Sequence, residues 1–141
     1  MNLPFFNRLP VKKISVLAAD NEEGQRAQKI VEGLLQDLPD LLLTCIVDIQ
    51  SGKLLAFYTV GSAYNPHHLS LRHAKLFQTL EAALAKQAWM TGPLLDISVI
   101  LEDQLHYACP CNEGKWCCFL AVYLKDANLG ITKKIVNRHT T

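Results

Sequence analysis

The apolar residues of this 141-residue chain are spaced differently in different segments. Two segments, residues 41–47 and 116–124, are apolar at nearly every position. A strand with this pattern is covered on both faces, so it lies in the interior of a sheet rather than at its edge. We therefore expect these two segments to be neighbouring central strands.

Residues 27–38 repeat apolar side chains at intervals of three and four positions. Such spacing gathers them on one face of an amphipathic helix. Asp20 and Glu23 match a capping box, in which side chains satisfy two free N–H groups at a helix start. Pro39 ends the helix because it disfavours helical geometry in the residue before it. The segment predicts one amphipathic helix that packs on the sheet.

A second, longer helix is expected at about residues 70–90, with a serine as its N-cap. Alanine, leucine, lysine, glutamine and glutamate dominate this stretch, and all favour helices. Its apolar residues form two stripes, although one stripe suffices to cover a sheet. The second stripe, which includes Leu71, Ala82 and Trp89, is therefore left without a partner. A third helix is expected at about residues 127–138.

Three further strands are expected at residues 54–60, 94–101 and 104–109. The first returns from the strand at 41–47 through a turn containing Asp, Ser and Gly, and the other two alternate apolar and polar side chains. Placing the two central strands side by side gives the spatial order 2-1-5-4-3 with antiparallel neighbours. The expected fold is α+β, a five-stranded antiparallel sheet with helices on both faces, formed by residues 20–141.

The strand at residues 94–101 falls at the edge of this sheet, where an apolar strand is seldom left unpaired. With the second stripe of the long helix, it would leave apolar surface in contact with water. Pairing of two copies through both elements would bury that surface, so we expect a homodimer. The residues expected at its interface are Leu71, Ala74, Gln78, Ala82, Ala85, Trp89, Leu94, Asp96, Ser98 and Ile100. In an alternative, an N-terminal extension, residues 1–19, folds back over the stripe.

The composition adds limits on the function. The chain is 50% hydrophobic and 19% charged, which is a globular composition. Its formal net charge of +1 gives no sign of nucleic-acid binding. No apolar run reaches the ~20 residues of a membrane helix, and the start of the chain lacks the pattern of a signal peptide. We expect a cytoplasmic protein that binds no nucleic acid and does not insert into membranes.

The cysteines near the last hairpin are the strongest candidate for a chemical site. Cys109, Cys111, Cys117 and Cys118, with His106, could approach one another on facing strands. Their spacing differs from the paired knuckles of zinc sites. Consecutive strand residues also point to opposite faces, so at most one of Cys117 and Cys118 can join the others. We expect these thiols to be buried as small apolar groups rather than to hold a metal.

The histidines of the central loop and long helix are a second candidate. His67, His68 and His73 have no carboxylate beside them at ligand spacing, and we expect them to be exposed. No serine lies in the context of a nucleophile elbow, and the glycines are isolated turn residues. The sequence therefore indicates a protein without enzymatic activity, cofactor or metal.

Three stretches carry a resemblance to a known family. They are residues 47–56 (VDIQSGKLLA), residues 76–87 (LFQTLEAALAKQ) and residues 119–136 (FLAVYLKDANLGITKKIV), in which Asn-Leu-Gly is the most telling piece. In this order and spacing they resemble the first hairpin, the dimer helix, and the last strand and helix of the Roadblock/LC7 family. Members of that family are profilin-like domains of dynein light chains and of bacterial regulators of Ras-like GTPases. The resemblance covers about residues 22–138.

The resemblance implies a homodimeric, non-enzymatic scaffold whose extended ten-stranded sheet binds another protein. In bacteria that partner is often a small Ras-like GTPase, and we expect such a GTPase or a related signalling protein here. Arg72 and Arg138 are expected to be surface charges, so no residue is assigned as an arginine finger. The chain departs from the family in its N-terminal extension, residues 64–68 and its cysteines. The alternative is a small-molecule or metal-sensing profilin-like domain, which requires a cavity near residues 61–68 or a metal at the cysteines.

Overall fold

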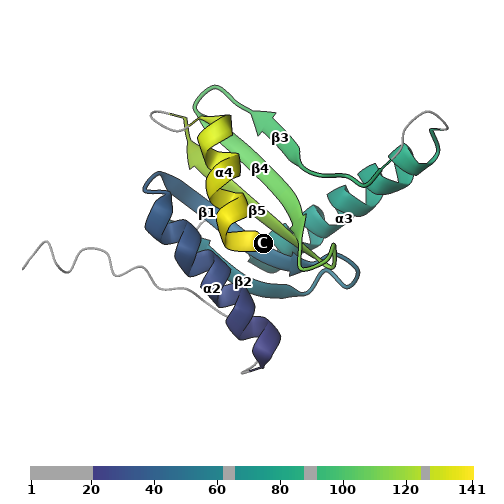
Figure 1. Cartoon of the computed structure of the whole chain (residues 1–141), viewed down its shortest axis with the longest axis horizontal. Helices are drawn as coiled ribbons and strands as arrows, with labels where there is room; N and C mark the ends of the chain where they lie inside the picture. The colour runs from purple at the N-terminus through teal and green to yellow at the C-terminus, as the bar shows by residue number, and fades with distance from the viewer. Residues whose placement is uncertain (1–20, 62–65, 88–91, 125–127) are drawn as a thin grey trace, which may run out of the picture.

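The structure is a computed structural model that describes residues 21–61, 66–87, 92–124 and 128–141, with the backbone alone at 66–70. It forms a layered α+β domain in which one sheet lies between helices (Figure 1). The elements in chain order are α2 (Glu22–Asp37), β1 (Leu41–Asp48), β2 (Leu54–Thr59), α3 (Pro66–Ala85), β3 (Ile97–Ile100), β4 (Gln104–Cys111), β5 (Trp116–Tyr123) and α4 (Leu129–Thr140). The predicted N-terminal extension lies outside the described residues.

The strands form one five-stranded antiparallel sheet in the order β2-β1-β5-β4-β3, which confirms the predicted order. β1 and β5 are neighbours at its centre, and their register places Cys45 opposite Phe119. β5 is buried along its whole length except at Tyr123. The uninterrupted apolar run of this segment is explained by its position, because both faces of β5 are covered.

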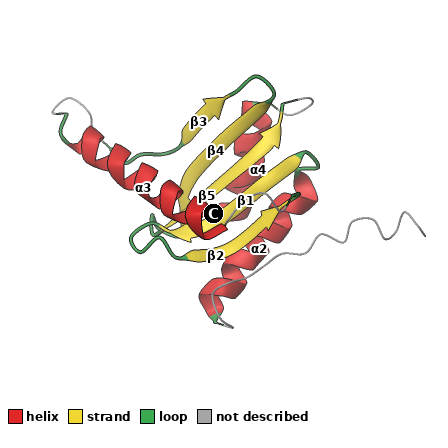
Figure 2. Ribbon diagram, turned by 180° about the vertical axis from the view of Figure 1, so that it is seen from behind, coloured by secondary structure: helices red, strands yellow, loops and turns green. Residues whose placement is uncertain are grey.

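α2 and α4 lie on one face of the sheet, and α3 lies on the other (Figure 2). Successive residues of β5 alternate between the two faces, as the pleat requires. The core beneath α2 and α4 includes Ala27, Val31, Leu34, Ile46, Leu55, Cys118, Leu120 and Val136. The core beneath α3 includes Leu43, Cys45, Phe57, Phe77, Cys117 and Phe119.

The start of α2 differs from the prediction. Its N-cap is Asn21, whose Oδ1 accepts a hydrogen bond from the Gly24 N–H at 2.8 Å. The predicted capping box is therefore wrong, and Asp20 lies outside the described residues. Asparagine suits this position because its side chain satisfies an N–H group that has no partner within the helix. The helix ends before Pro39, as predicted.

α4 packs beside α2 at a glycine. A Cβ atom at Gly33 would overlap the ring of His139, so glycine allows the close approach of the two helices. The Nε2 atom of His139 lies 2.6 Å from Asp37 Oδ2, and Arg138 Nη1 lies 3.2 Å from the same oxygen. The hydrogen bond with His139, helped by the Arg138 charge, lowers the pKa of the Asp37 carboxyl. These contacts join the C-terminal ends of α2 and α4.

The Asn-Leu-Gly step is the start of α4. Asn128 is the N-cap, and its Oδ1 accepts a hydrogen bond from the Ile131 N–H at 2.9 Å. The helix begins at Leu129, slightly later than predicted. The asparagine thus serves a local structural purpose, since it satisfies a free N–H group at the helix start.

α3 begins earlier than predicted, at Pro66 instead of after Ser70. Proline is favoured at the first helical position, where its missing N–H group is not needed. The helix ends at Ala85, and residues 88–91 of the predicted range lie outside the described residues. Figure 1 shows α3 crossing the sheet and projecting beyond it. In the described ranges, none of the helices combines the length and hydropathy needed to span a bilayer.

The β3 edge of the sheet is irregular. β3 has four residues, fewer than predicted, and β4 continues past it through Pro110. The Leu124 N–H donates to the Asp103 carbonyl oxygen at 3.0 Å, so these two residues form a hydrogen-bonded pair at the end of the β4–β5 ladder. Bonded and non-bonded pairs alternate along an antiparallel ladder, so Pro110 falls in a non-bonded pair with Cys117. Pro110 also lies beyond Ile97, which pairs with Ala108 at the end of the β3 ladder. The missing N–H group is therefore tolerated here.

Candidate interaction surface

α3 packs on the sheet along its first part only, up to about residue 80. There Ala74 and Phe77 are buried, with 3% and 0% of their surface exposed. The helix packs against β1, β2 and β5. Every residue from position 81 to 87 is exposed except Leu84, which is half-buried. The C-terminal end of α3, from residue 81, therefore projects past the sheet, with no other described helix or strand covering it (Figure 2).

The turn between β1 and β2 anchors α3. Gln78 donates from Nε2 to the Ile49 carbonyl oxygen at 2.6 Å. Gly52, in the same turn, has a φ of +74°, and a Cβ atom there would overlap the Leu71 side chain. Glycine is needed on both counts, since this backbone conformation is unfavourable for other residues. The helix is thus fixed at one end while its other end is free of the sheet.

Aromatic side chains line the α3 face of β5. The ring of His73 is half-buried and stacks on Phe119 with 3.6 Å between centroids, so its predicted exposure is wrong. His106 meets the same ring edge-on at 5.7 Å, and partial burial lowers the pKa of its imidazole. His73 Nδ1 lies 3.8 Å from Cys45 Sγ, but burial raises the pKa of that thiol to about 12. The pair is a packing contact, because a thiol with such a pKa is not a nucleophile at neutral pH.

β3 presents its outer edge to solvent. Ser98 is exposed, as are Val99 and Ile100, with 46% and 63% of their surface accessible. The Leu101 N–H donates to the Gln104 carbonyl oxygen at 2.8 Å. Bonded residues alternate along an antiparallel ladder, so the N–H groups of Ser98 and Ile100 point away from β4. The edge therefore offers two free donors to another strand.

Exposed apolar side chains concentrate on α3 and around β3. Nine large apolar side chains are exposed in the described part of the chain, and six of them lie there. We define the α3–β3 surface as the exposed residues Leu71, Leu76, Gln78, Ala82, Ala83, Ala85, Leu95, Ser98, Val99, Ile100 and Leu101. Exposed apolar surface of this kind marks a site where another molecule binds.

The expected interface residues fall into four groups. Leu71, Gln78, Ala82, Ala85, Ser98 and Ile100 are exposed and belong to the α3–β3 surface. Ala74 is buried, and Leu94 is half-buried against the core beneath α3. Asp96 is engaged within the protomer, where it accepts a hydrogen bond from the Tyr107 hydroxyl at 3.1 Å and pairs with Lys133 at 3.0 Å. Trp89 lies outside the described residues.

Four exposed apolar residues of the α3–β3 surface were not predicted from the sequence to lie at the interface. Leu95, Val99 and Leu101 alternate in sequence with the expected residues. Val99 and Leu101 lie on the face that α3 would cover if it reached β3, whereas Leu95 precedes the strand. Leu76 belongs to the other apolar stripe of the long helix, the one expected to cover the sheet, but it is 40% exposed. The alternation could have suggested the first three, although it does not reveal how far a helix on that face extends.

The cysteines of the last hairpin are divided between the two faces as predicted. Cys118 shares the core beneath α2 and α4 with Cys109 and Cys111, whereas Cys117 lies beneath α3. All are buried free thiols. A hydrogen bond from the Cys118 thiol lowers the pKa of Cys109, while burial raises the pKa of Cys111 to about 12.

Among the described residues, no group of three or more His, Cys, Asp or Glu side chains is arranged to hold a metal ion. The side chains of His67 and His68 lie outside that set, as do residues 62–65 of the loop named for a cavity.

The fold matches several solved structures. Myxococcus xanthus MglB has a TM-score of 0.74 and 11% identity, over 88% of this chain and 89% of that chain. An MglB described with a tetrameric arrangement has a TM-score of 0.70 and 16% identity, over 89% and 90% of the two chains. A Roadblock/LC7 domain from Streptomyces avermitilis has a TM-score of 0.65 and 14% identity, over 77% and 87%. Comparisons with models of protein families and with curated protein sequences give no match.

These similarities confirm the fold that the three sequence stretches indicated. The chain has the architecture of Roadblock/LC7 domains, and the match extends over most of its length. At identities of 11–16% the shared property is the fold. The similarities therefore do not identify a binding partner of this chain.

Proposed function

We propose that the protein is a non-enzymatic, homodimeric scaffold that binds a small Ras-like GTPase, or a related signalling protein, in the cytoplasm. The α3–β3 surface is the observation that supports this proposal. It combines exposed apolar side chains with a free strand edge, two features that soluble proteins seldom leave open.

A second copy of the chain would complement both features. Antiparallel pairing of two β3 strands would give acceptors to the N–H groups of Ser98 and Ile100 and would extend the sheet to ten strands. The small side chains of Ala82 and Ala85 would let the projecting ends of two α3 helices pack closely. A twofold axis makes such a surface complementary to itself. The tetrameric arrangement described for one MglB is self-association of this fold in that protein.

The choice of a GTPase as partner rests on the family resemblance. Roadblock/LC7 domains include bacterial regulators of Ras-like GTPases, and the fold of this chain is theirs. A dimer would offer a broad, rigid surface made of one sheet and a helix pair. We assign no arginine finger, since Arg72 is simply exposed and Arg138 pairs with Asp37. The protein would act by holding its partner in place.

Affinity capture from the native cell tests the partner. The tagged protein is presented with lysate containing either a non-hydrolysable GTP analogue or GDP, and captured proteins are identified by mass spectrometry. We expect a Ras-like GTPase, which is then purified and titrated by calorimetry. Ala82→Asp, which should separate the dimer, is expected to weaken binding at least ~10-fold. Ile131→Asp, on the exposed side of α4, is the matched control.

Three results would contradict the proposal at different points. A dimeric wild-type protein that captures no GTPase in either nucleotide state would overturn the partner while leaving the dimer intact. A wild-type protein that is monomeric at micromolar concentration would overturn the dimer itself. Substrate turnover by the purified protein would contradict its assignment as a scaffold.

A further inference from the structure

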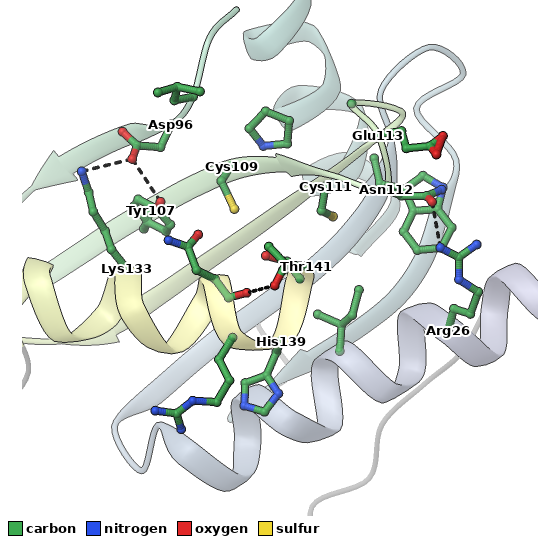
Figure 3. A pocket seen from close by; sticks show the side chains of 18 of the residues that line it. Arg26, Asp96, Tyr107, Cys109, Cys111, Asn112, Glu113, Lys133, His139 and Thr141 are labelled. Atoms are coloured by element: carbon green, nitrogen blue, oxygen red, sulfur yellow. Dashed lines mark hydrogen bonds and ion pairs between the residues drawn. The ribbon is translucent and has the colours of Figure 1, made fainter.

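A groove lies on the face of the sheet opposite α3. It opens between α2 and α4, above β4, and has a volume of about 970 Å³ (Figure 3). The lining extends from Asp96 and Lys133 at one end to Arg26 and Asn112 at the other. Ligand sites commonly have volumes of about 300–1,000 Å³, so the groove is large enough for several residues of a peptide.

The floor of the groove is apolar. It is formed by Tyr107, Cys109, Cys111 and Trp116, whose side chains come from β4 and β5. All four residues are buried, with 1–6% of their surface exposed. They belong to the core beneath α2 and α4 and lie at the base of the groove. An apolar side chain entering the groove would extend that core.

The two helical walls differ in charge. On the α4 wall the cations are paired: Lys133 lies 3.0 Å from Asp96, and Arg138 lies 3.2 Å from Asp37. On the α2 wall, Arg26 is exposed and makes no ion pair with a described residue. The α2 wall therefore has positive charge available for a ligand.

Arg26 is already positioned toward the groove. Its Nη2 donates to Asn112 Oδ1 at 2.8 Å, and its guanidinium lies 5.1 Å from the centre of the Trp116 ring. These contacts order the side chain and leave most of its five donors free. Lys29, one turn further along α2, is exposed and likewise makes no ion pair with the described residues. Against these two cations the lining has one unpaired acid, Glu113, so positive charge is in excess.

Trp116 gives a second, independent indication of a ligand. It is 1% exposed, and its Nε1 has no hydrogen-bond acceptor among the described residues. Buried N–H groups nearly always have an acceptor, so an unpaired one needs an explanation. Trp116 forms part of the groove lining. The Nε1 atom is itself buried, so a carbonyl or carboxylate oxygen of a bound ligand would supply the missing acceptor once a neighbouring side chain moves aside.

We infer that the groove binds an acidic segment of a partner protein, in which carboxylate side chains alternate with apolar ones. The carboxylates pair with Arg26 and Lys29, the apolar side chains cover Tyr107 and Cys109, and an oxygen of the segment accepts from Trp116 Nε1. An extended peptide fits better than a compact small molecule because the lining runs from Asp96 and Lys133 at one end of the groove to Arg26 and Asn112 at the other (Figure 3). The site lies on the face opposite α3 and shares only Leu95 with the α3–β3 surface, so it does not depend on the proposed GTPase binding.

Nuclear magnetic resonance on the full-length, isotope-labelled protein tests the inference. The probe is a synthetic peptide, acetyl-Glu-Leu-Glu-Leu-Glu-amide, titrated against the indole and backbone N–H resonances. The two indole signals are assigned with Trp89→Phe. We expect saturable shifts at Arg26, Cys109 and the Trp116 indole, the last moving downfield as it gains an acceptor. The peptide in which lysine replaces each glutamate should bind at least ~10-fold more weakly.

Charge reversals at two exposed arginines distinguish binding in the groove from non-specific electrostatic attraction of the acidic peptide. Arg26→Glu should weaken binding of the acidic peptide at least ~10-fold, whereas Arg72→Glu, the same change on α3, should leave it unchanged. Circular dichroism of both variants verifies folding. Absence of shifts at the Trp116 indole would overturn the inference, as would equal losses in both variants. Identical shifts with succinate at the same concentration would also overturn it, because the site would then hold a small dicarboxylate.

Discussion

β5 and β3 are apolar strands of the same sheet in opposite environments. Every residue of β5 from Trp116 to Val122 is buried. In β3, only Ile97 is partly buried, and the other three residues are exposed. The difference comes from their neighbours. β5 has a strand on each side and a core on each face, whereas β3 pairs with β4 alone, and α3 packs on β1, β2 and β5 instead.

The comparison shows that hydrophobicity identifies what must be covered without saying which chain covers it. The apolar residues of β5 are covered by this protomer, so their contribution belongs to folding. The apolar residues of β3 remain exposed in the protomer, so in the proposed dimer their contribution would belong to association. Substitutions in the two strands should therefore be seen in different measurements.

The largest expected effect is a loss of folding stability caused by a substitution in β5. Leu120→Ala removes a side chain with 0% exposure and should lower the free energy of unfolding by about 2–5 kcal/mol. Ile100→Ala, in β3, should change it by less than ~1 kcal/mol in a monomer. Urea unfolding measures both, and an Ala82→Asp background prevents dimer dissociation from contributing. Equal losses at the two positions would remove the distinction between the strands.

Association should show the opposite order. Ile100→Asp places a charge at the expected interface and should raise the dimer dissociation constant about 100-fold or more, because a buried unpaired charge is costly. Analytical ultracentrifugation measures this constant. Ile131→Asp introduces the same charge at an exposed apolar residue of α4 and should leave it unchanged. A dimer that tolerates Ile100→Asp must use another surface.

An intermediate effect is expected at the anchored half of α3. Gln78→Ala deletes the hydrogen bond to the Ile49 carbonyl oxygen and should lower the free energy of unfolding by about 1 kcal/mol. Gln36→Ala, at an exposed position of α2, should change it by less than ~0.5 kcal/mol. Chemical denaturation compares the two. Equal values would mean that the turn between β1 and β2 does not hold α3 in place.

The smallest expected effect is on the pH dependence of stability, through His106 of β4. Partial burial lowers the pKa of His106 below 6.5, so the unfolded chain takes up this proton at a higher pH than the folded chain. The stability from neutral His106 is therefore present above pH 6.5 and is lost as the pH falls from 6.5 toward the lowered pKa. His106→Gln should reduce the loss of stability between pH 7 and pH 5. Identical pH profiles in urea unfolding would contradict this reasoning.

The sheet order could be predicted because its evidence is local and strong. Two continuous apolar runs require central positions, and the short turns restrict how the remaining strands pair. The break before Pro39 is equally local, since proline limits the residue before it. The start of α2 shows the limit of such reasoning. Asp20, Asn21 and Glu23 are all compatible with a helix start, and only the backbone path selects Asn21 as the cap.

The candidate sites depend on distances that no local pattern contains. Whether α3 reaches β3 is set by its crossing of the sheet, so the exposure of Val99 was missed. His73 was expected at the surface, but its stacking on Phe119 joins residues far apart in sequence. The groove arises where α2 and α4 separate, and the unpaired Nε1 of Trp116 appears only once the surrounding atoms are placed.

Amide hydrogen exchange at β3 tests the central claim most directly. The N–H groups of Ser98 and Ile100 point away from β4, so within one protomer they have no strand to protect them. At a protein concentration above the dimer dissociation constant, we predict that both exchange as slowly as those of Ile97 and Val99, and that Ala82→Asp makes them fast. Fast exchange at Ser98 and Ile100 in the wild-type protein, with Ile97 and Val99 protected, would contradict pairing of β3 with a second copy.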